Sequence, residues 1–168
     1  MNVLALIFAL VVAAVVQALL PATRWTGYAP VPVMASVVVY YALLRPRPML
    51  LTAAVGAGLV EDSLGQMPLG YSVFCYCVVG LVIEHFRDSL LVRQWTTHVT
   101  LGLLVNLGVT LAVLLLLAKD GLIVPDVWHT VLRLGGAMLL GAATAPFVFA
   151  LLEHMDQTLG MVDEEADA

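Results

Sequence analysis

The stretch Thr96–Ala118, TTHVTLGLLVNLGVTLAVLLLLA, decides the fold class of this chain. It contains no Asp, Glu, Lys or Arg, and about 20 apolar residues in a helix are enough to cross the hydrocarbon core of a bilayer. The rest of the chain is similar, since 62% of its 168 residues are hydrophobic and 11% are charged. Soluble domains are about 25% charged. The sequence therefore predicts an integral membrane protein without room for a soluble domain.

Five further apolar runs predict an all-α polytopic membrane protein with a six-helix transmembrane bundle. Prolines, glycines or charged residues separate these runs, which cover Val3–Leu20, Val31–Leu44, Met49–Val60, Leu69–Ile83 and Val127–Leu152. Met49–Val60 is shorter than a span, so it either continues through Glu61–Leu64 or does not cross, which would leave five spans. We expect one transmembrane domain over residues 1–155 and an acidic, disordered cytoplasmic tail over 156–168.

The arginines predict the orientation in the membrane. With the N-terminus inside, the inner connections hold Arg45, Arg47, Arg87 and Arg93, and the positive-inside rule then favours N-in/C-in. Half of the twelve acidic residues lie from Glu153 onward. The remainder of the chain has no basic patch, which excludes nucleic acid as an expected partner.

Small and polar residues recur at four-residue spacing in the first run, at Ala5, Ala9, Ala13 and Gln17. Membrane helices meet through small residues, so this face either packs inside the bundle or docks a partner helix. The regularity of the stripe makes it a candidate docking face. Candidate intramembrane polar contacts lie further along the chain, at His98, Asn106 and Arg133.

Asp62 is the most informative single residue, because a carboxylate near the membrane centre costs about 2.5–3.5 kcal/mol. One interpretation is an interfacial acid that closes a short helix. The other is a carboxylate held in a break between half-helices, with Arg133 as a hypothetical partner.

Catalytic and metal-binding patterns are not evident. The histidines, His85, His98, His129 and His154, have no ligand spacing with another His or Cys. Cys75 and Cys77 are two residues apart, on nearly opposite sides of a helix. We therefore expect no enzyme activity, no cofactor and no metal.

The segment Gly58–Gly70, GLVEDSLGQMPLG, with the apolar run that follows it to Val82, resembles the signature stretch of the MreD family of rod shape-determining proteins. The specific matches are Gly58, Asp62, Pro68, Leu69 and Gly70. The resemblance implies a non-catalytic, multi-pass subunit of the bacterial elongation complex in the cytoplasmic membrane. Such a subunit binds the single-span protein MreC and helps couple peptidoglycan synthesis to MreB; other complex members, a penicillin-binding transpeptidase and a glycosyltransferase, are further implied partners, with membrane lipid around them.

The MreD family is similar in fold to the substrate-binding membrane subunits of energy-coupling-factor vitamin transporters, which supplies the alternative function. Those subunits also use alanines of the first span to meet a coupling partner. A vitamin site needs convergent polar and aromatic groups, and the outer side of this chain offers few of them, at Trp25, Tyr28, Tyr71, Trp128 and His129. We therefore favour the scaffold.

Overall fold

The computed structural model describes residues 3–19, 31–65, 68–87, 95–121 and 127–158. These residues form six α-helices and no strand, which confirms the all-helical class. The last helix runs to Thr158, so it includes the first three residues of the expected tail 156–168, and residues 159–168 lie outside the described part. The helices are α1 (Val3–Leu19), α2 (Val33–Leu44), α3 (Arg47–Leu64), α4 (Tyr71–Phe86), α5 (Trp95–Lys119) and α6 (Val127–Thr158).

α3 continues through Glu61–Leu64. This is one of the two alternatives predicted for the short third run. Its 18 residues start directly after Pro46, and Pro48 lies in the first turn. Proline is tolerated there, since the first amides of a helix have no intrahelical acceptor. The helix rises about 27 Å at 1.5 Å per residue.

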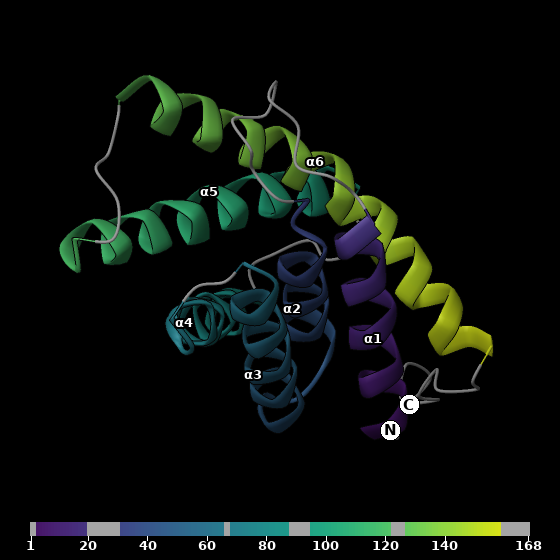
Figure 1. Cartoon of the computed structure of the whole chain (residues 1–168). Coiled ribbons are helices and arrows are strands. Elements are labelled where there is room, and N and C mark those ends of the chain that lie inside the picture. Colours follow the sequence, from purple (N-terminus) through teal and green to yellow (C-terminus); the bar gives the residue numbers. More distant parts are fainter. Residues whose placement is uncertain (1–2, 20–30, 66–67, 88–94, 122–126, 159–168) are drawn as a thin grey trace.

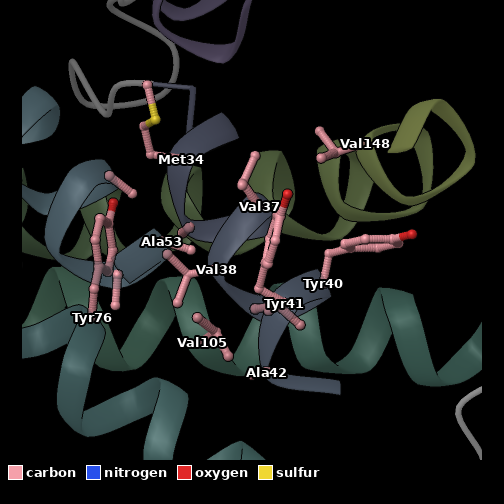
Figure 2. Close-up of a cluster of buried hydrophobic side chains, with 14 of the residues drawn as sticks. Met34, Val37, Val38, Tyr40, Tyr41, Ala42, Ala53, Tyr76, Val105 and Val148 are labelled. Atoms are coloured by element: carbon pink, nitrogen blue, oxygen red, sulfur yellow. The ribbon is translucent and has the colours of Figure 1, made fainter. Parts of the chain in front are cut away.

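α2 is the central helix. Every residue from Val33 to Leu43 is buried, and α2 packs against each of the other five helices. A helix that is apolar on all sides must be surrounded. The close-up of the core shows α2 side chains flanked by Ala53 of α3, Tyr76 of α4, Val105 of α5 and Val148 of α6 (Figure 2).

The six helix axes do not share one direction. α1, α2 and α3 run beside one another, α4 is seen nearly along its axis, and α5 and α6 form a long hairpin that crosses them (Figure 1). Two helical segments, Thr96–Lys119 and Trp128–Met155, are long and apolar enough to cross a membrane. The six spans and the N-in/C-in orientation stay predictions.

The interior and the surface have an unusual distribution of side chains. Among the described residues six polar side chains are buried, while phenylalanines such as Phe8, Phe74 and Phe147 are more than half exposed. Small residues form the closest helix contacts, as at Gly102 and Gly141. Large apolar side chains exposed on the outside, and small residues at close helix contacts, are typical of helices packed in lipid. The buried polar residues are Gln17, Ser36, Asp62, Ser72, His98 and Asn106.

Candidate functional site: the polar break between α3 and α4

Asp62 holds the start of α4 against the end of α3. Its side chain is 1% exposed, its Oδ2 accepts the amide of Gly70 at 2.6 Å, and its Oδ1 accepts the amide of Ser72 at 3.0 Å. The first amides of a helix lack intrahelical acceptors and carry partial positive charge. The carboxylate of one helix therefore caps the next helix, and this matches the interpretation of Asp62 as an acid held in a break.

The glycines of this break have separate structural reasons. Gly70 has φ 109°, a left-handed conformation that favours glycine, and it directly precedes α4. Gly58 faces the backbone of Val73, and a Cβ there would collide with its Cα and N atoms. Pro68 and Leu69 lie in the connection between the helices and are exposed. The structure thus brings Gly58, Asp62 and Gly70 together in one corner.

Glu61, which precedes Asp62, bonds to side chains of α1 and α4, and its α1 partner Gln17 also bonds to α2. Gln17 of α1 donates from Nε2 to Glu61 Oε2 at 2.7 Å, and its Oε1 accepts the Met34 amide of α2 at 3.3 Å. The Tyr76 hydroxyl of α4 also hydrogen-bonds to the Glu61 carboxylate. One partly buried polar cluster, made of Gln17, Glu61 and Tyr76 with Asp62 next to it in the chain, therefore connects α1, α3 and α4.

Glu61 and Tyr76 are not among the site residues that the sequence predicts. The sequence signal that points to them is the pair of adjacent acids at the end of an apolar helix, because each carboxylate buried there needs its own polar partners. Gln17 was selected, but as part of a docking face rather than as a partner of Glu61.

The expected pairing of Asp62 with Arg133 is wrong. Both carboxylate oxygens of Asp62 accept backbone amides of the α4 start. Arg133 lies in α6, and its buried Nε has no hydrogen-bond partner among the described residues. The α4 amides follow Asp62 by only eight and ten residues in the chain, so local capping satisfies the carboxylate.

His98 and Asn106 lie at the crossing of α5 and α6. The His98 ring stacks on Phe149 with ring centroids 4.1 Å apart. Asn106 donates from Nδ2 to the Gly102 carbonyl of its own helix at 2.6 Å and lies against Gly141 of α6. Both side chains therefore help to pack the hairpin.

The predicted docking face of α1 is buried inside the chain. Ala9, Ala13 and Gln17 are each less than a tenth exposed, while the side chain of Ala5 lies outside the described part. The outward side of α1 carries large apolar residues instead, including Phe8 and Val15. The burial of these described residues favours internal packing, the other of the two alternatives, over a docking surface for a partner helix.

An ion pair lies at the other ends of α3 and α4. Arg47 Nε and Glu84 Oε1 are 2.9 Å apart, and Glu84 follows the predicted span Leu69–Ile83. The hydrogen bond and positive charge of Arg47 lower the pKa of the Glu84 carboxyl. The pair places the start of α3 next to the end of α4, as expected for consecutive antiparallel helices.

Within the described ranges no group of three His, Cys, Asp or Glu side chains could hold a metal ion. The chain matches no family model, and the searches of curated proteins and solved structures also give no match. The arrangement of the polar break is that of a helix-capping and helix-joining site.

Proposed function

We propose that this chain is a non-catalytic, multi-pass protein of the bacterial cytoplasmic membrane that acts as a scaffold of the MreD kind. Two features support the membrane placement: the large apolar side chains on the outside, and the two helices long enough to span. The polar side chains that are buried are used for capping and packing, which suits a protein whose function is to hold helices.

The observation that carries the proposal is the corner at Gly58, Asp62 and Gly70. These are three of the five residues on which the resemblance to the MreD family rests. Asp62 accepts the Gly70 amide, and Gly58 allows the close approach of α3 to the Val73 backbone at the start of α4. We propose an MreC-like single-span protein as the main partner, with MreB, the transpeptidase and the glycosyltransferase reached through the assembled complex.

The vitamin-transporter alternative receives less support from the cavity between α1, α2 and α6. Its volume is about 140 Å³, whereas sites for drug-sized ligands measure about 300–1,000 Å³ and contain several placed polar groups. The lining here is apolar apart from Thr144, whose hydroxyl bonds to the Leu140 carbonyl.

Co-purification tests the proposed function. The tagged chain is expressed together with the MreC-like protein of the same organism, membranes are solubilised in a mild detergent, and the captured partner is quantified. We expect stoichiometric capture of the MreC-like protein and none of an unrelated single-span protein. Failure of the wild-type chain to capture the MreC-like protein from membranes that contain both would contradict the proposal.

Two aspartate variants connect the test to the corner. Asp62→Asn removes the charge that caps α4, whereas Asp120→Asn changes an exposed aspartate just after α5. We expect reduced capture only for Asp62→Asn. Equal capture by both variants would show that the partner does not depend on the corner.

A further inference from the structure

α1, α2 and α6 enclose a cavity of about 140 Å³ that the helix-capping corner does not use. Its lining includes Ala9 and Ala13 of α1, Val37 of α2, and Phe147 and Val148 of α6. The space exists because α1 presents alanines where larger side chains would meet α6. The buried alanine stripe therefore leaves a vacant volume rather than a tight helix contact.

Among the described residues, the lining of the cavity offers no free polar group to a ligand. Thr144 supplies the only side-chain hydroxyl of these lining residues, and this hydroxyl donates to the Leu140 carbonyl at 2.8 Å. Apolar cavities of about 150 Å³ stay dry and bind small hydrocarbons, since water needs two or more polar partners. The chemistry of the lining thus selects a saturated or aromatic hydrocarbon and excludes a hydrated solute.

The cavity reaches the surface between α1 and α6, two helices that lie next to each other in Figure 1. Phe147, 73% exposed, and Leu151, 41% exposed, belong to both the lining and the outer face of α6. On the α1 side, Val16 does the same at 39% exposure. The mouth is therefore apolar, and it opens on a surface that the proposed function places in lipid.

We propose that this cavity holds part of one acyl chain of a membrane phospholipid, whose headgroup stays outside. The acyl chain has the chemistry of the lining, and it can enter from the surrounding bilayer without passing a polar barrier. The inference rests on the membrane placement in the proposed function but not on the MreC-like partner. Ala13 is a buried alanine of the α1 lining, so a larger side chain there would reduce the volume of the cavity.

Native mass spectrometry of the full chain in a mild detergent with added phosphatidylcholine tests the site. We expect wild-type protein to retain one phospholipid, Ala13→Leu to reduce this occupancy at least fivefold, and Ala18→Leu to leave it unchanged. Ala18 is a matched control because it is an exposed alanine of the same helix. Equal retention by a folded Ala13→Leu variant, or equal loss in both variants, would overturn the inference.

A measurement on the wild-type protein alone covers the case in which Ala13→Leu does not fold. Lysophosphatidylcholine carries one acyl chain, and glycerophosphocholine carries the same headgroup without a chain. A ligand that binds only the folded state raises its stability, so we expect an increase in melting temperature with the first compound and none with the second. An equal increase with both, or with neither, would overturn acyl-chain binding.

The two proposals fail separately. A chain found in the membrane fraction that binds its partner but retains no lipid contradicts only the acyl-chain site. A chain that retains lipid but captures no MreC-like protein contradicts only the scaffold function.

Discussion

The α3–α4 corner and the α5–α6 hairpin each bring two helices together at a glycine, but different forces hold them. In the corner, Gly58 faces the backbone of Val73, and the Asp62 carboxylate adds two hydrogen bonds to the start of α4. In the hairpin, Gly102 and Gly141 approach each other closely. Asn106, beside them, donates its side-chain hydrogen bond to the Gly102 carbonyl of its own helix.

The comparison separates two ways of packing helices where lipid supplies no apolar driving force. The corner depends on acceptor atoms, so it should be sensitive to loss of charge and hydrogen bonds at nearly constant volume. The hairpin depends on space, so it should be sensitive to added volume without any change in polarity. Substitutions that change only one of these properties distinguish the two regions.

The largest expected effect is that of Asp62→Ala. Each hydrogen bond to a charged group contributes about 1.5–3 kcal/mol, so loss of both should lower the free energy of unfolding by about 3–6 kcal/mol. Asp62→Asn keeps one acceptor oxygen and should fall between this variant and the wild type. Unfolding by SDS titration in mixed micelles measures the difference.

Asp120→Ala is the control for that prediction, because Asp120 is exposed next to the end of α5. Exposed substitutions of this kind usually change stability by less than about 0.5 kcal/mol. If Asp62→Ala unfolded at the same SDS fraction as Asp120→Ala, the corner would not depend on the carboxylate.

Gly141→Ala should give the next largest effect. The new Cβ would collide with the Asn106 side chain and the Gly102 carbonyl oxygen of α5. Overpacking of this kind costs about 1–3 kcal/mol. Gly135→Ala on the same helix adds a methyl group where no atom lies within 4 Å, so it should be neutral or stabilising by up to about 1 kcal/mol through helix propensity.

The same SDS titration measures this pair of alanine variants. A larger loss at Gly135 than at Gly141 would contradict the close contact in the hairpin. An equal loss of stability at both positions would show that the effect arises within α6 itself rather than at its contact with α5.

The helices themselves could be predicted from the sequence because apolar runs and proline or glycine breaks are local signals. The run Val31–Leu44 ends at the same residue as α2, and the break before Gly70 lies where expected. The cap at Asp62 could be predicted for the same reason, because the Asp62 carboxylate and the amides of Gly70 and Ser72 that it accepts are close in the chain.

The contact of Gln17 with Glu61 and the surroundings of Arg133 could not be predicted, because both depend on how helices distant in the sequence cross. Gln17 reaches Glu61 across 44 residues, and nothing in either local pattern specifies that meeting. The alanine stripe of α1 shows the same difficulty, since small side chains look alike whether they face a partner or the interior. The expected pairing of Arg133 with Asp62 rests on their similar depth in the expected bundle. The backbone amides of Gly70 and Ser72 bind the Asp62 carboxylate instead.

The Gln17–Glu61 hydrogen bond should have a smaller effect than either contact above. Side-chain hydrogen bonds between membrane helices couple by about 0.6 kcal/mol on average and at most about 1.7 kcal/mol. A double-mutant cycle of Gln17→Leu and Glu61→Ala, followed by SDS unfolding, should give a coupling in this range. The matched cycle of Gln17→Leu with Glu153→Ala, an exposed acid of α6, should give none.

The smallest expected effect belongs to the Arg47–Glu84 pair, because Arg47 is largely exposed and salt screens such pairs. Arg47 lowers the pKa of Glu84, so the pair stabilises the folded chain above the ordinary carboxyl pKa of about 4.3. This stabilisation is lost as the pH falls through the lowered pKa. The difference in melting temperature between wild type and Arg47→Gln should therefore be small at pH 7 and vanish on acidification. Lys119→Gln, which changes an exposed cation of α5, should show no such dependence. A difference for Arg47→Gln that grew on acidification would contradict the pair. It would mean that Arg47 stabilises the fold more when the Glu84 carboxyl is protonated, whereas an arginine favours the ionised form.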